Sequence, residues 1–334
     1  MRRLALWFAL CAIALCAQTK KILVTDPSAL KELEGASSQV RLVPVTKENV
    51  MQEIADADAY IGSIRPEEVR AGKNLKWVQV MSAGVETVLF RSGSNDLRDS
   101  NIVLTNNKVV QGPEIADHAM AMLLSLARYI PMYVMDRQQE RWRRGERFPG
   151  IELNGRTAVV IGVGGIGTQI AFRAWAFGMN VIGVDPEDKP FMPILKKLVK
   201  PDQLNEVLPE ADVVFISAPH TPVSNKMMGA RQFDLLKKGS YFIAVSRGGL
   251  YDINGLVKAL DEKRLAGAGV DVTDPEPLPK GHALWKFENV IVTPHIAGRS
   301  DKDHARMVGT IRENIRRFVE GKPLLNVVDK QKGY

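Results

Sequence analysis

A glycine-rich turn between an apolar strand and a helix is the feature that most restricts how this chain can fold. Residues 157–161 form a short apolar run, Gly162-Val-Gly-Gly-Ile-Gly167 follows directly, and helical spacing continues to Phe177. Glycines at this spacing allow a tight turn, close backbone approach to a bound group, and close packing of the helix on the strand. The free N–H groups at the start of such a helix bind pyrophosphate. The turn therefore predicts a Rossmann unit that binds a dinucleotide.

An acidic residue after the next strand indicates which dinucleotide is bound. The strand 180–184 ends in Asp185, eighteen residues after the last glycine of the turn. A carboxylate at this place can accept hydrogen bonds from both ribose hydroxyls and repels a 2′-phosphate. The sequence therefore favours NAD (NADH) over NADP. A glycine-rich turn that binds no nucleotide is the alternative, but strand, helix and acid occur together here.

Short apolar runs alternate with amphipathic stretches after residue 20, which is typical of parallel sheets covered by helices. The first series of expected strands is 21–25, 40–45, 58–62, 76–81 and 102–105. The second series is 157–161, 180–184, 212–217, 240–245, 267–271 and 289–293. Helical spacing marks residues 112–128 between the two series and about 301–320 after them. We therefore predict an α/β chain with two doubly wound parallel-sheet domains.

The first residues have the layout of a secretory signal peptide. Arg2 and Arg3 precede an apolar run from Leu4 to Ala17, and polar Gln18 follows. The run is shorter than the roughly 20 apolar residues of a membrane-spanning helix. We expect residues 1–17 to be a cleaved leader and the protein to be exported, to the periplasm or the medium, without integral membrane association. A misassigned start or a frayed helix in a cytoplasmic protein is the alternative.

Composition excludes several classes of protein. Apolar residues make up 45% and charged residues 25% of the chain, which is ordinary for a globular protein. The formal charge of +7 falls to +5 without Arg2 and Arg3, and no basic stripe contains interleaved aromatics, so we expect no nucleic-acid partner. Both cysteines, Cys11 and Cys16, lie in the leader. We therefore expect neither disulfides, nor thiolate chemistry, nor a metal site.

Polar residues follow four strands of the second series at the point where each strand ends. In a doubly wound sheet, ligands bind at this carboxyl edge. His220 follows the third strand and Arg247 the fourth, Asp271 ends the fifth with Glu276 in the loop beyond, and His295 follows the sixth. An arginine, a carboxylate and an imidazole should therefore meet where the nicotinamide lies.

These three groups suit the reduction of a keto acid. As a hydride reaches the carbonyl carbon, negative charge builds on the oxygen, and a protonated His295 can deliver the proton. Glu276 favours the imidazolium form of that histidine. Arg247 can bind a substrate carboxylate through two parallel hydrogen bonds. We predict hydride transfer between nicotinamide and the 2-carbon of a small 2-hydroxy or 2-keto acid.

Each assignment has a structural alternative. Arg247 could bind the cofactor's phosphates, and Glu276, which stands between two prolines, could belong to a rigid surface loop. His118 lies within a helix and is expected to be structural, and His220 is expected to line the cofactor. His295 is the only histidine at a strand end with an acid-bearing loop nearby, so we assign catalysis to it.

Motifs far apart in the chain point to one family. They are Ser82-Ala-Gly-Val85, Ile115-Ala-Asp-His118, the glycine turn 162–167, Val245-Ser-Arg-Gly-Gly249, Gly269-Val-Asp-Val272, Glu276-Pro-Leu-Pro279 and Thr293-Pro-His-Ile-Ala-Gly298. Over nearly its whole length after the leader, the chain resembles the D-isomer-specific 2-hydroxyacid dehydrogenases, which include glyoxylate/hydroxypyruvate reductases, phosphoglycerate dehydrogenases and formate dehydrogenases. The family's catalytic arginine, glutamate and histidine fall on Arg247, Glu276 and His295.

The resemblance implies further properties. The backbone around Ser82, Ala83 and Gly84 would cradle the substrate carboxylate together with Arg247. A flavodoxin-like substrate domain of residues 18–105 and 298–334 would flank an NAD-binding Rossmann domain of residues 106–297, in a homodimer. The expected cofactor contacts are Gly162, Gly164, Gly165, Ile166, Gly167, Asp185, Ala218, Pro219, His220, Val245, Ser246, Arg247, Asp271, His295, Ala297 and Gly298.

Departures from the family pattern keep alternatives open. Glu86 stands where many members have aspartate, and Asp117 where many have glutamate; both keep the charge but change the reach of the side chain, so they bear on substrate preference more than on activity. A non-catalytic NAD-sensing module on the same scaffold is the main alternative, although the complete Arg247, Glu276 and His295 set favours an enzyme. A formate dehydrogenase would need a different pattern near the carboxylate site. We also expect no appended regulatory domain.

The leader hypothesis is testable directly. We expect protein purified from its native host to begin near Gln18, because the small residue Ala17 before a polar break is a typical cleavage position. N-terminal sequencing measures this start. A start at Met1 would refute processing.

Overall fold

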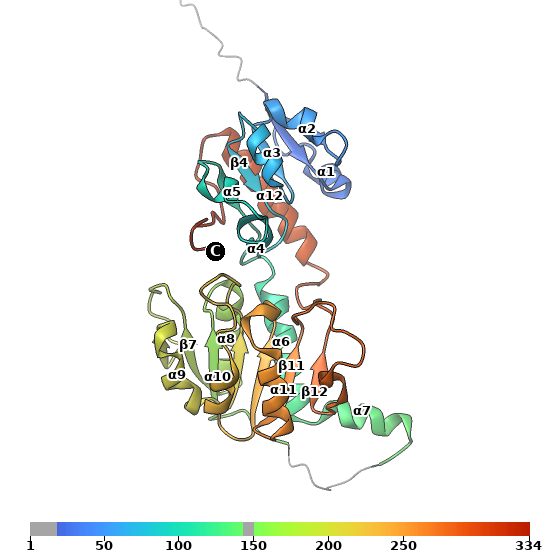
Figure 1. Ribbon diagram of the computed structural model, residues 1–334, viewed down its shortest axis with the longest axis vertical. Helices are drawn as coiled ribbons and strands as arrows, with labels where there is room; N and C mark the ends of the chain where they lie inside the picture. The colour runs from blue at the N-terminus through green and yellow to red at the C-terminus, as the bar shows by residue number, and fades with distance from the viewer. Residues whose placement is uncertain (1–18, 143–149) are drawn as a thin grey trace, which may run out of the picture.

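The computed structural model of the chain describes residues 19–142 and 150–334. The predicted leader, residues 1–17, lies outside the described residues. Figure 1 shows two lobes, one above the other, and the chain passes between them before α6 and again before α12. The expected α/β fold with two parallel sheets is confirmed. In the described part of the chain, none of the helices combines the length and the apolar character needed to cross a bilayer.

The first lobe is built on a five-stranded sheet with the order β2-β1-β3-β4-β5, and all its strand pairs are parallel. This is the flavodoxin-like doubly wound order. Its strands are β1 (Lys20–Val24), β2 (Val40–Pro44), β3 (Ala59–Ile61), β4 (Trp77–Gln79) and β5 (Val103–Thr105). Its helices are α1 (Pro27–Leu33), α2 (Val50–Glu53), α3 (Pro66–Ala71), α4 (Glu86–Leu89) and α5 (Asp96–Asp99), with the 3₁₀ turn η1 (Ile54–Asp56).

The second lobe is built on a seven-stranded parallel sheet with the order β12-β11-β10-β9-β6-β7-β8. Its strands are β6 (Thr157–Ile161), β7 (Asn180–Val184), β8 (Lys197–Val199), β9 (Val213–Ile216), β10 (Ser240–Ala244), β11 (Leu265–Val270) and β12 (Val290–Val292). Its helices are α6 (Gly112–Ala127), α7 (Ile130–Gln138), α8 (Gly165–Ala176), α9 (Leu204–Val207), α10 (Ala230–Leu235) and α11 (Ile253–Asp261). Four 3₁₀ turns complete it: η2 (Pro201–Gln203), η3 (Leu208–Glu210), η4 (Gly248–Leu250) and η5 (Ala283–Lys286). The order reverses between β6 and β9, as in a Rossmann fold.

Every strand predicted from the sequence is present, with ends that differ by no more than two residues. One strand, β8, was not predicted. It is three residues long, lies at the edge of the sheet, and begins with the two exposed residues Lys197 and Leu198. An edge strand with one buried position shows no apolar run, because only one side chain faces the core.

The helix α12 (Asp303–Val319) packs on the first sheet although it follows the second in the chain. Its apolar residues Val308, Ile311 and Ile315 join a buried cluster with Trp77. Fully buried Asn314 donates from Nδ2 to Gln79 Oε1 at 3.0 Å and to the carbonyl of Leu325 at 3.1 Å, and its Oδ1 accepts from the N–H of Leu325 at 2.7 Å. Breaking such a buried network costs about 1–3 kcal/mol for each partner left unsatisfied. The chain after residue 303 is thus fixed to the first lobe, while the domain boundaries at 105/106 and 297/298 remain a prediction.

Candidate functional site

The glycine turn after β6 leaves room for a ligand at one glycine only. Gly162 has a φ of +87°, and a Cβ there would lie 2.6 Å from the backbone of Ala218. A Cβ on Gly167 would lie 1.8 Å from the carbonyl oxygen of Gly162. At Gly164, which is the N-cap of α8, a Cβ would meet nothing within 4 Å. The first and third glycines are therefore needed for packing, and the second leaves the helix N-terminus open. This arrangement fits a dinucleotide pyrophosphate.

Asp185, at the end of β7, is tied to this turn. Its Oδ2 accepts from the N–H of Val163 at 2.8 Å, and its Oδ1 accepts from the N–H of Glu187 at 2.9 Å. The ammonium of Lys189 lies 3.3 Å from Oδ1. Lys189 was not predicted from the sequence, although its position four residues after the acid could have suggested it. Its charge weakens the repulsion that Asp185 would exert on a 2′-phosphate.

His295 and Glu276 meet as predicted. The Nδ1 atom of His295 lies 2.6 Å from Glu276 Oε1, and both side chains are about two-fifths exposed, at 40% and 43%. An ionised carboxylate only accepts hydrogen bonds, so Nδ1 carries the proton of this bond. Within the described part of the chain, Nε2 has no hydrogen-bond partner. The ring is therefore oriented through one nitrogen and can exchange a proton through the other.

Asp271 fixes the loop that carries His295. Its Oδ1 accepts from Thr293 Oγ1 at 2.6 Å and from the N–H of Ile296 at 2.9 Å, and its Oδ2 accepts from the N–H of Ala297 at 3.0 Å. The backbone of His295 has a φ of +53°, and its N–H donates to the carbonyl of Asp271 at 2.8 Å. Both carboxylate oxygens of this buried aspartate thus bind the loop. Its predicted contact with the cofactor remains a prediction.

His118 supports the same loop from α6. Its Nε2 lies 2.9 Å from Thr293 Oγ1 and 3.8 Å from Asp271 Oδ1. The histidine thus contacts the residue that precedes Pro294 and His295. This position agrees with the structural role expected for His118.

Arg247 reaches from the second lobe to the loop after β4 in the first. Its Nε donates to Glu86 Oε1 at 2.5 Å, and its Nη1 donates to the carbonyl of Ser246 at 2.7 Å. A Cβ on Gly84 would lie 2.2 Å from Nη2, so only glycine allows the guanidinium to come this close. The structure therefore brings Arg247 and Gly84 together, as expected of two groups that would share one carboxylate.

Glu86 is the counter-charge of Arg247, a role that no sequence pattern indicated. The Glu86 side chain is 13% exposed and that of Arg247 26%. Burial alone would raise the pKa of Glu86, but the charge and the hydrogen bond of Arg247 outweigh it, so the pKa is lowered from its ordinary value of 4.5. The sequence showed only that glutamate replaces aspartate here. The longer side chain allows the carboxylate to reach a guanidinium on the other lobe.

A second contact between the lobes involves His220, after β9. Arg91 Nη2 lies 3.0 Å from His220 Nδ1, and His220 Nε2 lies 3.0 Å from Asn225 Oδ1. A guanidinium cannot accept a hydrogen bond, so Nδ1 is the acceptor and Nε2 carries the proton. A Cβ on Gly249 would lie 2.4 Å from the ring. His220 thus joins the two lobes, and Arg91 is a site residue that no sequence motif indicated.

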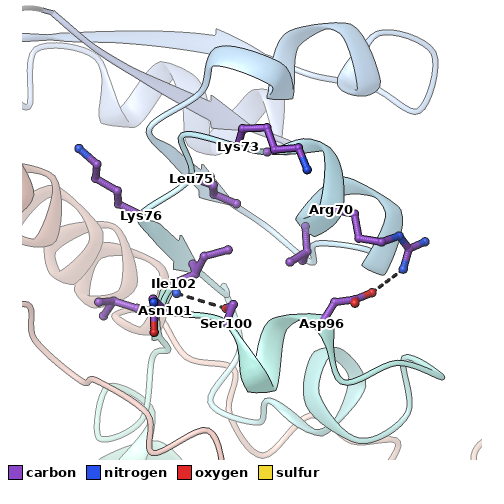
Figure 2. Close-up of a pocket in the computed structure, with 11 residues that line it drawn as sticks. Arg70, Lys73, Leu75, Lys76, Asp96, Ser100, Asn101 and Ile102 are labelled. Carbon is purple, nitrogen blue, oxygen red and sulfur yellow. Dashed lines mark hydrogen bonds and ion pairs between the residues drawn. The ribbon is translucent and has the colours of Figure 1, made fainter.

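A separate groove lies on the first lobe, at the amino ends of β4 and β5 (Figure 2). It has a volume of about 610 Å³ and is lined by Arg70, Lys73 and Lys76, among others, near the starts of β4 and β5. Arg70 is paired with Asp96. Because ligands of doubly wound sheets bind at the carboxyl edge, we do not assign this groove to the candidate site.

Comparison with known proteins decides the family. The model of the NAD-binding domain of the D-isomer specific 2-hydroxyacid dehydrogenases matches residues 120–297, more than half of the chain. The chain belongs to the D-isomer specific 2-hydroxyacid dehydrogenase family. Members of this family are oxidoreductases, and the family expected from the sequence motifs is confirmed.

Three relatives illustrate the similarity. The D-3-phosphoglycerate dehydrogenase of Methanocaldococcus jannaschii is 33% identical over 92% of this chain and 59% of its own length. The glyoxylate reductase of Korarchaeum cryptofilum is 29% identical over 86% of this chain and 87% of its own. A crystal structure of a D-isomer specific 2-hydroxyacid dehydrogenase from Xanthobacter autotrophicus, in complex with NADPH and MES, covers 95% of this chain and 100% of its own, with a TM-score of 0.81 and 24% identity. The chain spans 59% of the length of the curated phosphoglycerate dehydrogenases that it matches.

We expect the Glu86–Arg247 pair to stabilise the folded chain more at neutral pH than in acid. Because the pKa of Glu86 is lower in the folded than in the unfolded chain, the pair contributes fully above pH 4.5 and loses its contribution as the pH falls through the folded value. We expect Glu86→Gln to lower the free energy of unfolding by about 1–2 kcal/mol at pH 7 and by less in acid. Urea denaturation at several pH values measures this.

The matched control is Glu67→Gln. Glu67 pairs with Arg65 at 3.1 Å, but both side chains are more than 40% exposed. We expect it to change the free energy of unfolding by less than about 0.5 kcal/mol. Equal losses in both variants, or a loss in Glu86→Gln that grows as the pH falls, would contradict the role assigned to Glu86.

Proposed function

We propose that this chain is an NAD-dependent dehydrogenase that interconverts a small D-2-hydroxy acid and its 2-keto acid. The observation that carries the proposal is the hydrogen bond between His295 and Glu276. These residues follow β12 and β11, two strands of the sheet that also carries the glycine turn. NADH, when bound, supplies the hydride. The side chains supply the proton, the substrate binding and the orientation, and the curated relatives act on compounds of this class according to their names.

His295 is the acid in reduction and the base in oxidation. Its Nδ1 is engaged by Glu276, so the proton delivered to the carbonyl oxygen leaves from Nε2. The glutamate carboxylate stabilises the imidazolium before the transfer. The buried carboxylate of Asp271 keeps the loop, and with it the ring, in place. The two acids thus have different tasks, charge stabilisation for Glu276 and loop geometry for Asp271.

Arg247 and the Ser82–Gly84 loop bind the substrate carboxylate. Glu86 engages Nε and the carbonyl of Ser246 engages Nη1, which leaves Nη2 beside Gly84. A carboxylate at this position would also meet backbone N–H groups of the loop. Two points of contact orient the carbonyl carbon toward the nicotinamide. Glu86 serves as the positioning residue that fixes the guanidinium plane.

The cofactor proposed is NAD, with NADP second. Oδ1 of Asp185 already meets the N–H of Glu187 and the ammonium of Lys189, but Oδ2 accepts only from the N–H of Val163, so it can still accept from a ribose hydroxyl. Lys189 reduces its repulsion of a 2′-phosphate, and the similar Xanthobacter protein was crystallised with NADPH. Both dinucleotides are therefore included in the test.

We expect His295→Gln to lower kcat for keto-acid reduction by about 10²–10⁴, because the proton donor is lost, while NADH affinity is retained. The assay follows NADH or NADPH absorbance with glyoxylate, hydroxypyruvate, pyruvate and longer 2-keto acids. His304→Gln is the matched control, because His304 pairs with Glu32 on the surface of the first lobe. Full turnover in His295→Gln would defeat the catalytic assignment. NADH binding without turnover of any acid by the unaltered protein would support the sensing module.

A homodimer is part of the proposal. On α8, the large apolar residues Phe172 and Trp175 are 52% and 50% exposed, and Phe177, which follows the helix as its C-cap, is 45% exposed. Helix α7 projects from the second lobe in Figure 1, and its residues Ile130 and Val134 are 47% and 45% exposed. Large apolar side chains that are exposed on a helix can mark a protein interface. A second copy of the chain is the partner that the family suggests.

We expect Phe172→Glu to yield monomers, because a charge buried in an apolar interface is strongly unfavourable. Light scattering coupled to gel filtration measures the mass. Phe191→Glu is the matched control, since Phe191 is 89% exposed in the loop after β7. An unaltered mass in Phe172→Glu, or equal dissociation of both variants, would rule out α8 as the interface.

Export remains a proposal as well. The support is the layout of residues 1–17 and the position of β1, which begins at Lys20 just after the proposed cleavage point. A processed chain would therefore retain every strand of the first sheet.

A further inference from the structure

A compact turn at residues 329–334 lies between the two lobes. The N–H of Asp329 donates to the carbonyl of Tyr334 at 3.0 Å, and the N–H of Gly333 donates to the carbonyl of Asp329 at 2.7 Å. The side chain of Asp329 accepts from the N–H groups of Gln331 and Lys332 at 3.0 and 3.1 Å. This segment, which we name the 329–334 turn, is therefore held in shape by its own hydrogen bonds.

The 329–334 turn is anchored on the first lobe. The N–H of Val328 donates to the carbonyl of Leu104, in β5, at 2.9 Å. The ammonium of Lys330 donates to the carbonyls of Leu97 and Ser100 at 3.0 and 2.5 Å. Burial lowers the pKa of Lys330, which is consistent with an ammonium enclosed by backbone carbonyls rather than water. The turn therefore moves with the first lobe.

The same turn contacts one residue of the second lobe with two side chains. Lys332 Nζ and the Tyr334 hydroxyl donate to Glu187 Oε1 at 2.6 and 2.9 Å. Gly333 is buried with a φ of +83°, and a Cβ there would lie 2.5 Å from Phe90 of the first lobe and 3.4 Å from Thr221 of the second. Figure 1 shows this end of the chain between the lobes. Only glycine fits at this point of contact.

Glu187 connects the turn to the glycine-turn site. It belongs to the loop after β7, and its N–H donates to Asp185 Oδ1 at 2.9 Å. Both donors of the 329–334 turn go to Glu187, and none goes to Asp185, whose partners Val163, Glu187 and Lys189 all belong to the second lobe. Burial and the neighbouring carboxylates raise the pKa of Tyr334 to about 12, so its hydroxyl stays a donor at neutral pH.

We propose that the 329–334 turn is a brace for the adenosine end of the cofactor site: through Lys332 and Tyr334 the first lobe holds Glu187, and Glu187 holds the carboxylate that binds the ribose. The inference rests on the proposed binding of the dinucleotide at Asp185. Lys332, Tyr334 and Glu187 are therefore positioning residues for the adenosine ribose, although none of them touches the reacting atoms.

The brace predicts a defect confined to the adenosine half of the cofactor. In Glu187→Gln and in the double variant Lys332→Met/Tyr334→Phe, we expect NADH and ADP-ribose to dissociate with a Kd about fivefold higher, as suits the loss of a partly exposed charged contact. The value of kcat and the KM for the keto acid should change by less than about twofold, because the reacting groups are untouched. NADH fluorescence measures its binding, and calorimetry measures that of ADP-ribose.

Two comparisons make the test specific. Lys322→Met removes a lysine that pairs with Glu320 on the first lobe and does not reach the second, so it should bind NADH as the unaltered protein does. The triple variant Glu187→Gln/Lys332→Met/Tyr334→Phe should bind no more weakly than either set alone, because both sets remove the same contact.

The outcomes separate this inference from the proposed function. An unchanged Kd would overturn the brace, and so would additive losses in the triple variant. Tighter NADH binding in the variants would also overturn it, because the turn would then obstruct the site. If the unaltered protein binds neither NADH nor NADPH, the proposed function itself fails. If it binds them and the variants bind them equally well, only the brace fails.

Discussion

The carboxylate of Asp271 is the group on which the geometry of the candidate site depends. It accepts three hydrogen bonds from residues 293–297, two of them from backbone N–H groups. Within this loop His295 has a left-handed backbone, which costs a residue with a side chain about 1–2 kcal/mol. Hydrogen bonds to a charged acceptor contribute about 1.5–3 kcal/mol each, so the bonds outweigh the strain. Because Asp271 directly follows β11, the imidazole is held by the sheet itself.

The carboxyl edge of the seven-stranded sheet is also where the lobes meet. Arg247 follows β10 and binds Glu86, His220 follows β9 and binds Arg91, and Glu187 follows β7 and binds the 329–334 turn. In each contact the partner comes from the first lobe. Any ligand at this edge therefore lies among side chains that already join the lobes. Binding and the relative position of the lobes must be coupled, because the same groups take part in both.

The sequence predicts the features that depend on local patterns. Apolar runs locate the strands, and the glycine turn locates the dinucleotide site, because a period or a spacing within one element carries the signal. The approach of His295 to Glu276 follows from parallel topology, since strand ends share one edge. Arg91, the 329–334 turn and the partner of Glu86 could not be found in this way. Each contact joins surfaces of two separately folded lobes, whose relative position no local pattern encodes.

The cofactor preference inferred from Asp185, at the end of β7, also depends on a contact that the sequence pattern does not include. Its presence favours NAD if the carboxylate is considered alone, but Lys189 lies 3.3 Å from it and offsets part of its charge. Electrostatic repulsion therefore discriminates less than the sequence rule assumes. Hydrogen-bonding capacity still discriminates. Asp185 is 95% buried, and its Oδ2 accepts only from the N–H of Val163, so a ribose 2′-hydroxyl could donate to this oxygen, whereas a 2′-phosphate dianion has no proton to donate. The preference for NAD that we propose would thus depend more on satisfying a buried acceptor than on repelling an anion.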